Sequence, residues 1–377
     1  MALGHPRVEE AVILAPPGGR GEFESLDCVA RNASRVRVVE QPKRLGTGHA
    51  LQVIVRDAGE DDYLIVYSDV YIARQSWRVV WSLEPDSVLL VEVGKPSEYG
   101  VAVIEDGEVR GFVEKPEPGR EPSNLALAGV YALSREALQR LGDLKPSPRG
   151  ELELTDLLSV LAVEGALGFR RVQEGPWRDV GRPWDYLLAF RDAIENELEP
   201  RISGEVHPTA VLEGPVYIAP GARVGPNTIV EGPAFIGSGA KLGPCTRVRP
   251  YTALLDGAKA GFSVEVKASI LLEGAKAPHL NYVGDSIVGE HVNLGAGTVT
   301  ANLRFDHRTV KMTVKGRRVD TGLRKLGAVI GGYAQTGINV SIMPGVKIGS
   351  YARIWPGCVV SRDVPGGAEY RCPEARG

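Results

Sequence analysis

Apolar runs of strand length alternate with helical stretches through the first half of the chain. AVILA at 11–15 and SVLLVEV at 87–93 have the length of strands, whereas SREALQRLG at 134–142 and PWDYLLAFRDAIENELE at 183–199 read as helices. Strands and helices that alternate at this spacing are typical of a sheet covered on both faces. The pattern therefore predicts an α/β domain over residues 1–200.

A different period begins after Pro200. Aliphatic residues recur every six residues from Val206 to Leu271, and the same frame resumes from Ile330 through Thr336 to Val360. A period of six fits neither a helix nor a strand, and it is typical of the hexapeptide repeat of a parallel β-helix. Each hexad then forms one flat side of a triangular coil, with its aliphatic residue on copies ~4.8 Å above and below. We expect this β-helix over residues 204–365, followed by a tail at 366–377.

Two segments interrupt the six-residue frame, at residues 272–287 and 303–328. Insertions in a solenoid are expected on its working face. The second one is rich in Arg and Lys, which suits either a solvated hairpin or a clamp for a phosphate or coenzyme A. Because the flat sides of a β-helix leave surface to cover, we also expect a homo-oligomer.

Charge and composition narrow the function. With 44 basic and 47 acidic residues in 377, the net charge is −3, so no general field attracts nucleic acid or an anionic membrane. The apolar runs are too short to span a bilayer and no signal-peptide pattern opens the chain, which favours a cytoplasmic protein. The cysteines (Cys28, Cys245, Cys358 and Cys372) form no CxxC pair. The cysteine spacing indicates neither a disulfide framework nor a zinc site, and we expect all four cysteines to be buried or incidental thiols.

Candidate chemistry gathers in the β-helix half. The first interruption places His279 close to Tyr282, and Lys267 and Arg249 precede it. An isolated histidine is usually structural, but one beside two cations and several amides suits a general base next to an anion pocket. The amides are those of Asn281, Asn293 and Asn302.

In the first half, QPKRLGTGHAL at 41–51 has the form of a base-binding loop. Gly46-Thr47-Gly48 opens a helix, so backbone amides are able to approach a planar ligand near Gln41.

From Gly181 to Val364 the chain resembles the acetyltransferase half of the bifunctional sugar-1-phosphate nucleotidylyltransferase and glucosamine-1-phosphate acetyltransferase family, above all its archaeal branch. The matching stretches include VEVKASI at 264–270, KAPHLNYVGD at 276–285, VNLGAGTVTANLRFD at 292–306 and TGINVSIMPGVKIG at 336–349. The resemblance implies a left-handed β-helix that associates as a homotrimer.

The same resemblance implies roles for individual residues. His279 would take a proton from the sugar amine as the amine attacks the thioester of acetyl-CoA. Arg249 and Lys267 would hold the sugar phosphate. Other implied contacts are Tyr282 and Asn293 to the sugar, Asn302 to substrate and cofactor, and Ala296 and Gly332 to coenzyme A. Arg308 stands where the family has a lysine, which retains the charge and alters the geometry.

The first half resembles the family's Rossmann-like nucleotidyltransferase domain, which would use UTP and Mg²⁺. Implied nucleotide-sugar contacts are Gln41, Gly46, Thr47, Gly100 and Glu114, and implied metal ligands are Asp69 and Asp179. A magnesium ion between two carboxylates and a triphosphate is ordinary chemistry for nucleotidyl transfer.

This half departs from the family in three ways. No Gly-rich basic loop that would cradle the triphosphate, and no strand before it, precedes Gln41. Ser68 replaces a glycine before the metal aspartate, and Leu127 replaces an asparagine that would bind the sugar's N-acetyl group. We therefore expect impaired nucleotidyl transfer, either because the reading frame starts upstream of Met1 or because this half is a relic.

Three functions follow from these observations. The first is an acetyltransferase for glucosamine-1-phosphate or its galacto epimer, in UDP-N-acetylglucosamine biosynthesis. The second is the fully bifunctional enzyme, read from an earlier start. The third is a non-catalytic assembly subunit, which has no need of the His279, Lys267 and Tyr282 constellation.

Overall fold

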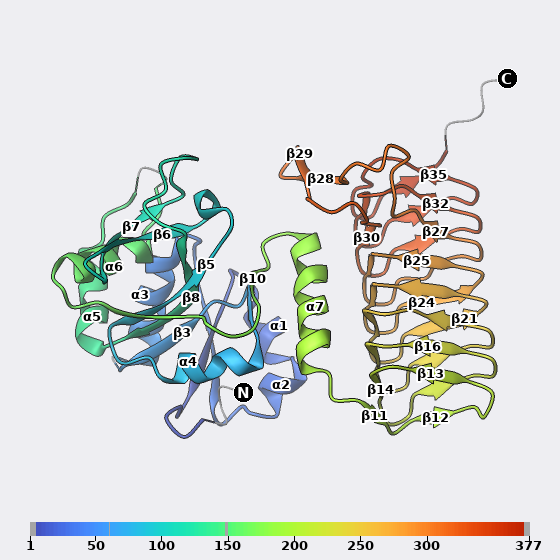
Figure 1. The fold of residues 1–377 in the computed structure, drawn as a ribbon, viewed down its shortest axis with the longest axis horizontal. Coiled ribbons are helices and arrows are strands. Elements are labelled where there is room, and N and C mark those ends of the chain that lie inside the picture. The colour runs from blue at the N-terminus through green and yellow to red at the C-terminus, as the bar shows by residue number, and fades with distance from the viewer. Residues whose placement is uncertain (1–4, 60, 148–149, 373–377) are drawn as a thin grey trace. The chain divides into compact units, whose positions relative to one another are not determined.

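The computed structural model describes residues 5–59, 61–147 and 150–372. It divides into two compact units, Met1–Trp177 and Arg178–Gly377 (Figure 1). No helix within those ranges is long and apolar enough to cross a membrane. Each unit is described by itself below.

The first unit is built on one mixed sheet. Its strand order is β7-β6-β8-β5-β9, with β3 antiparallel to β8. Five of the six residues of β5 are buried, as expected of a central strand. The strands are β3 (Tyr63–Val66), β5 (Ser87–Glu92), β6 (Gly100–Glu105), β7 (Glu108–Glu114), β8 (Leu125–Leu133) and β9 (Gly168–Arg171).

Helices cover both faces of this sheet, which confirms the predicted α/β class. Leu51, Leu138 and Leu158, from three different helices, pack into one core with strand residues such as Val88. A second core contains Val80 from another helix. The helices are α3 (Thr47–Ala58), α4 (Trp77–Trp81), α5 (Arg135–Gln139) and α6 (Leu154–Val163), with shorter turns at Arg74–Ser76, Pro96–Glu98 and Arg140–Asp143.

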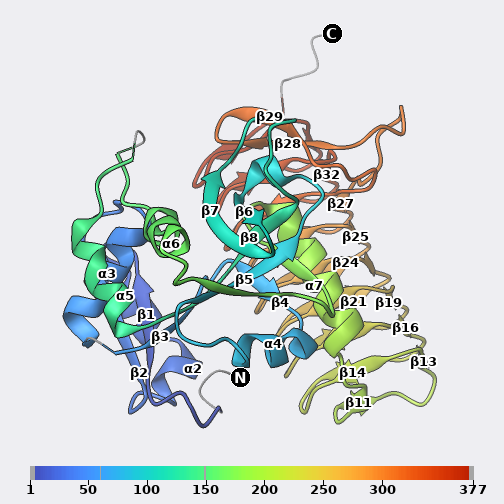
Figure 2. The same cartoon turned by 60° about the vertical axis from the view of Figure 1, so that its left-hand side comes forward.

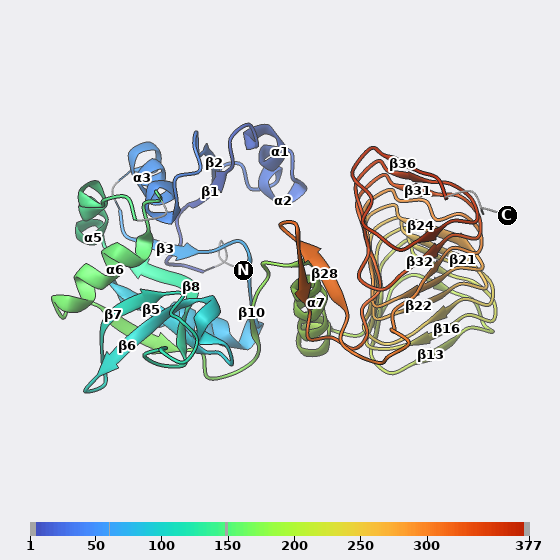
Figure 3. The same cartoon turned by 90° about the horizontal axis from the view of Figure 1, so that it is seen from above.

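A separate pair of strands stands beside the main sheet. β1 (Ala11–Ala15) pairs in parallel with β2 (Val36–Glu40), and α1 (Arg20–Glu24) and α2 (Asp27–Ala30) connect them (Figure 3). Among the described residues, β1 pairs only with β2 and β3 only with β8. Each of these apolar strands therefore has one edge whose backbone groups make no ladder.

The second unit is a three-sided stack of parallel strands, here called sides 1, 2 and 3 in chain order (Figures 1 and 2). Side 1 comprises β11 (Arg201–Ile202), β14 (Val216–Ile218), β17 (Ala234–Ile236), β20 (Thr252–Leu254), β23 (Ile270–Leu271), β26 (Ile287–Val288), β30 (Val329–Ile330) and β33 (Lys347–Ile348). Side 2 comprises β12 (Glu205–Val206), β15 (Arg223–Val224), β18 (Lys241–Leu242), β21 (Lys259–Phe262) and β24 (Lys276–His279), then β31 (Gln335–Thr336), β34 (Arg353–Ile354) and β36 (Glu369–Tyr370). Side 3 comprises β13 (Val211–Glu213), β16 (Ile229–Glu231), β19 (Arg247–Val248), β22 (Glu265–Lys267), β25 (Tyr282–Gly284), β27 (Val299–Thr300), β32 (Ser341–Ile342) and β35 (Val359–Val360).

The hexad aliphatics form the core of this stack, as predicted. Ile236, Leu254 and Leu271 follow one another in register on side 1 and are fully buried. Groups that meet between coils lie 18 residues apart, for example Ser238 and Asp256, so three hexads make one coil.

The prediction of an interruption at residues 272–287 is wrong. These residues lie in regular strands, β24, β25 and β26, that continue all three sides. Coils here are one residue shorter, because Ser269 and Ser286, 17 residues apart, meet between them. The lost residue shifts the six-residue frame without breaking the stack.

The second interruption is a true insertion. It leaves side 3 after β27, forms an antiparallel hairpin of β28 (Lys311–Val314) and β29 (Arg317–Asp320), and returns to side 1 at β30. The buried side chains of Met312 and Leu326 pack against Trp184 of α7 (Pro183–Glu197). These contacts explain why α7 belongs to the β-helix unit, although the sequence analysis placed the boundary at residue 200.

The cysteine prediction is also corrected. Cys358 and Cys372 form a disulfide, whereas Cys28 and Cys245 are free and exposed. The chain returns over the last coil as β36 on side 2, which brings the two sulfurs together although they are 14 residues apart.

The remaining strands are β4 (Val70–Ile72) and β10 (Trp177–Asp179).

Candidate active site

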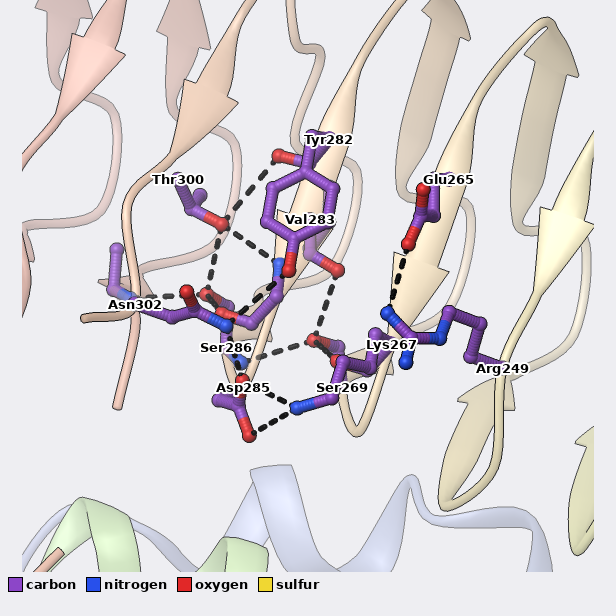
Figure 4. A network of polar contacts seen from close by, with 12 residues as sticks. Arg249, Glu265, Lys267, Ser269, Tyr282, Val283, Asp285, Ser286, Thr300 and Asn302 are labelled. Carbon is purple, nitrogen blue, oxygen red and sulfur yellow. Dashed lines mark hydrogen bonds and ion pairs between the residues drawn. The ribbon is translucent and has the colours of Figure 1, made fainter. Parts of the chain in front are cut away.

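Four of the predicted residues lie along side 3 and at its corner with side 1. Arg249, Lys267, Tyr282 and Asn302 come from successive coils, and the last three gather around the carboxylate of Asp285 (Figure 4). Lys267 Nζ lies 3.1 Å from Asp285 Oδ1 and 3.0 Å from Oδ2. Asn302 Nδ2 donates to Asp285 Oδ2 at 2.5 Å and to the Tyr282 hydroxyl at 3.2 Å.

The backbone explains why these side chains meet. Lys267 is in register with Gly284 of the next coil. Asp285, the residue after Gly284, therefore lies at the same corner as Lys267. The Asp285 N–H donates to the Lys267 carbonyl at 2.9 Å, and the Asp285 carbonyl accepts from the Gly327 N–H at 2.8 Å. With φ at 48°, Asp285 is left-handed, a conformation that aspartate tolerates better than most residues.

Gly284 leaves the room that the cluster needs. A Cβ at this position would lie 2.7 Å from the Tyr282 hydroxyl and 2.8 Å from Asn302 Nδ2. Only glycine therefore allows both groups to stand where they are.

Both cations predicted to bind the sugar phosphate are paired with carboxylates. Arg249 Nη1 lies 3.1 Å from Glu265 Oε1, and Lys267 is held by Asp285. Arg249 Nε is buried and has no hydrogen-bond partner within the described part of the chain. An unsatisfied buried donor on a cation is a feature that an anionic ligand would complete.

Burial, and next the charge of Asp285, raise the pKa of the Tyr282 phenol above its ordinary value. The phenol is therefore protonated at neutral pH and has a proton to donate while it accepts from Asn302.

His279 lies at the other end of side 3, at the corner with side 2. Its exposed imidazole makes no hydrogen bond or ion pair with any described residue, whereas its backbone is fixed by Asn281 and Gly297. Asn281 is buried and donates to the Gly295 carbonyl at 2.8 Å, so this amide shapes the turn. An open groove of about 630 Å³ runs from His279 down side 2, past Phe262.

Three further predicted residues lie away from the Asp285 cluster. Asn293 is exposed on side 2, bridged to the backbones of Lys276 and Gln335. Ala296 lies at the corner between sides 2 and 3, and Gly332 at the corner between sides 1 and 2. One chain thus distributes the predicted acetyl-transfer residues over all three corners.

The insertion contacts Asn302 through its backbone, not through Arg308. Arg308 is exposed, and its N–H donates to Asp306 in the loop before β28. Lys325 instead pairs in antiparallel fashion with Leu303, and the next N–H, of Leu326, donates to the Asn302 carbonyl at 3.0 Å.

In the first unit, the predicted base-binding loop is held by protein contacts. Gln41 Nε2 lies 3.0 Å from His49 Nδ1, and Thr47 Oγ1 accepts from the Leu154 N–H at 3.0 Å. The Gly48 N–H donates to the Leu152 carbonyl, so this amide of the helix start is already satisfied. Gly46 has φ at 98°, which favours glycine there.

The predicted sugar contacts of this unit do meet. Gly100 is in register with Glu114, and a Cβ on Gly100 would lie 2.9 Å from Glu114 Oε2 and 3.3 Å from Leu127 Cδ1. The apolar Leu127 therefore faces the same small space as Gly100.

The predicted metal ligands come from different units. Asp69 is exposed just before β4, and the half-buried Asp179 ends β10, beyond the boundary between the units. Within the described residues, no three His, Cys, Asp or Glu side chains cluster as a metal site.

Fold and site together define a two-part transferase, with a nucleotidyltransferase-like unit before a hexapeptide β-helix. Residues 8–196 match the nucleotidyl transferase family, and residues 327–362 match the bacterial transferase hexapeptide family of six repeats.

Relatives narrow this class. The bifunctional sugar-1-phosphate nucleotidylyltransferase/acetyltransferase of Sulfurisphaera tokodaii is 43% identical over 321 residues, which are 85% of this chain and 79% of that protein. The bifunctional protein GlmU of Methanococcus maripaludis is 46% identical over 331 residues, which are 88% of this chain and 79% of that protein. A glucose-1-phosphate thymidylyltransferase of Streptomyces antibioticus is 36% identical over 196 residues, half of this chain and 54% of that protein. The chain belongs to the family of bifunctional sugar-1-phosphate nucleotidylyltransferases and acetyltransferases, and it is a transferase.

Proposed function

We propose that this chain transfers the acetyl group of acetyl-CoA to the amine of glucosamine-1-phosphate, or of its galacto epimer, with His279 as general base. The observation that carries the proposal is the cluster of Lys267, Tyr282 and Asn302 around one carboxylate, beside the unsatisfied Arg249 Nε. Cations and amides of this kind suit a phosphorylated sugar.

The reaction requires one proton acceptor. The amine attacks the thioester carbonyl, the C–N bond forms, and the C–S bond breaks to release coenzyme A. The neutral imidazole of His279 takes the proton that the amine loses and returns it to the leaving thiolate. In this proposal Arg249 and Lys267 bind the phosphate, Asn293 binds the sugar, and Ala296 and Gly332 line the coenzyme.

The distribution over corners supports assembly into a homotrimer through the β-helix. His279 and the Asp285 cluster stand at opposite ends of side 3, and the imidazole has no orienting partner among the described residues. A base usually has such a partner. In a closed assembly, a second copy would bring its own corner to His279 and complete the site.

We expect nucleotidyl transfer by the first unit to be impaired. Leu127 lies next to Gly100 and offers no hydrogen bond to an N-acetyl group, a loss of about 1–3 kcal/mol. Asp69 and Asp179 offer the oxygen ligands that Mg²⁺ prefers, and the ion, when bound, would offset charge on UTP phosphates. Gln41, Gly46, Thr47 and Glu114 would contact the nucleotide sugar.

The test is mass spectrometry of one reaction that contains the chain, glucosamine-1-phosphate, acetyl-CoA, UTP and Mg²⁺. We expect N-acetylglucosamine-1-phosphate alone. UDP-N-acetylglucosamine would show that both activities are present, and the absence of any product would favour an assembly subunit.

A matched variant tests the base. His279→Ala should abolish acetyl transfer while the fold stays intact, because the exposed imidazole makes no hydrogen bond or ion pair with the described residues. Unchanged turnover would remove His279 from the mechanism.

A further inference from the structure

Asp285 is the residue on which the cluster depends, yet no step of the proposed reaction uses it. Its side chain is 16% exposed and that of Lys267 is 19% exposed, so the ion pair is largely shielded from water. Both carboxylate oxygens are engaged, one with Lys267 alone and the other with Lys267 and Asn302. A shielded, charge-assisted contact of this kind holds its partners more firmly than a surface pair.

We propose that Asp285 is a positioning residue for acetyl transfer, which fixes the orientation of the Asn302 amide and the place of the Lys267 ammonium. This inference rests on the proposed function.

The hydrogen bonds assign the direction of the Asn302 amide. Its nitrogen donates to Asp285 and to the Tyr282 hydroxyl, so both of its protons are used within the cluster. The carboxylate accepts only, which makes the opposite orientation, with Asn302 Oδ1 towards Asp285, a repulsive contact. Within the described residues, Oδ1 is therefore the end of this side chain that has no hydrogen-bond partner.

An oriented amide oxygen recognises an N–H donor. Two substrates of the proposed reaction carry one, namely the amine of the sugar and the amides of the pantetheine arm. Because Oδ1 accepts and does not donate, Asn302 would hold either donor, and separate measurements with the two substrates distinguish them.

The ammonium of Lys267 is positioned by the same carboxylate. Two of its contacts are with Asp285, and the third proton of the ammonium, which has no acceptor in the described part of the chain, is left for a ligand. Asp285 also offsets the charge of Lys267, so its removal would by electrostatics alone strengthen binding of a sugar phosphate. Removal of Asp285 would therefore have two opposite effects: displacement of Lys267 would weaken catalysis, whereas the gain in net positive charge would strengthen binding of the sugar phosphate. Kinetics can separate the positioning role of Asp285 from its charge.

The test compares Asp285→Asn and Asp285→Glu with wild type by steady-state kinetics, varying each substrate in turn. The asparagine keeps only one acceptor oxygen and no charge, so it cannot hold the Lys267 ammonium through two oxygens or give either contact charge assistance. We expect kcat to fall about 10- to 100-fold, the loss of a charge-assisted hydrogen bond, while KM for glucosamine-1-phosphate stays equal or falls. A rise of KM for acetyl-CoA alone would assign Oδ1 to the pantetheine arm. Asp285→Glu, which keeps the charge, should recover part of kcat.

Asp363→Asn is the matched control. Asp363 also accepts from a backbone N–H and pairs with a lysine, Lys347, in a later coil, and it lies outside the cluster. Equal kinetics for Asp285→Asn and Asp363→Asn would overturn the proposal.

A crystal structure of Asp285→Asn decides the question without activity. We expect the side chains of Lys267 and Asn302 to move away from their wild-type places, and unmoved side chains would overturn the positioning role. If wild type transfers no acetyl group, the proposed function fails, and this comparison still tests Asp285.

Discussion

At the scale of single residues, the site depends on a position that has no side chain. Gly284 faces the Tyr282 hydroxyl and Asn302 Nδ2, and any Cβ there would come closer than van der Waals contact allows. The hydrogen bond between the Tyr282 phenol and the Asn302 amide therefore requires that residue 284 has no Cβ.

We predict that Gly284→Ala lowers acetyl transfer at least tenfold by displacing Tyr282 and Asn302, a misplacement of the kind that costs orders of magnitude in rate. Initial rates at saturating substrates would measure it. Gly111→Ala is the control, because a Cβ on Gly111 meets nothing within 4 Å. Full activity in Gly284→Ala would mean that the cluster adjusts without loss.

A second residue-scale prediction concerns Tyr282 and pH. Its pKa is raised in the folded chain, so the neutral phenol stabilises the fold below the unfolded pKa of about 10, and that contribution is lost as the pH rises through the folded pKa. Tyr282→Phe should therefore lose less stability than wild type between about pH 9 and pH 11. Urea unfolding at both pH values would measure the difference, and parallel losses would contradict it.

The sequence predicted the side chains proposed to bind ligands better than it predicted the residue that positions those side chains. Lys267, Tyr282 and Asn302 were found by residue type and family resemblance, and the structure brings them together. Asp285 was not predicted as a site residue, because its role depends on contacts with the coil before and the coil after it. Its proximity to Lys267 becomes visible only once the register of the coils, with Lys267 opposite Gly284, is known.

At the scale of elements, α7 and the inserted hairpin stabilise each other. Trp184 is 2% exposed and packs with Val310, Met312 and Leu326. The same α7 reaches the stack lower down, where Arg191 lies over the ring of Tyr251 at 4.2 Å and Glu195 accepts from its hydroxyl. The helix thus braces the corner that carries the Asp285 cluster.

We predict that Trp184→Ala destabilises the chain by about 3–5 kcal/mol, the usual cost of removing a buried aromatic. Because Leu326 also donates to the Asn302 carbonyl, acetyl transfer should fall as well. Denaturant unfolding and initial rates would measure both effects. Phe305→Ala in the same insertion is the control, since that ring is fully exposed, and equal effects of the two changes would refute the bracing role.

Element boundaries show why period alone was insufficient. The six-residue frame predicted the stack, but 17-residue coils near Ser286 made a regular region resemble a loop. A count of hexads assumes that every corner has the same number of residues. A corner is able to lose one residue, however, while the buried aliphatic residues of successive coils stay in register.

At the scale of the whole molecule, we propose that a second chain completes the site. We predict that mixed assemblies of His279→Ala and Lys267→Ala chains recover activity that neither variant has alone. If each site takes His279 from one copy and Lys267 from the next, random mixing restores roughly a quarter of the sites. Rates of co-expressed chains would measure this, with separately purified and unmixed variants as controls. No recovery would place both residues of a site in one copy.

The contacts between α7 and the stack also limit how the number of coils in the β-helix could change. α7 has 15 residues, about 22 Å at 1.5 Å per residue, and it touches the stack both at Tyr251 and at the hairpin. One coil adds about 4.8 Å and one helical turn about 5.4 Å, so the two steps nearly match. A relative with an extra coil between Tyr251 and the hairpin should therefore carry an extra helical turn as well. The length of α7 therefore constrains the number of coils between Tyr251 and the hairpin.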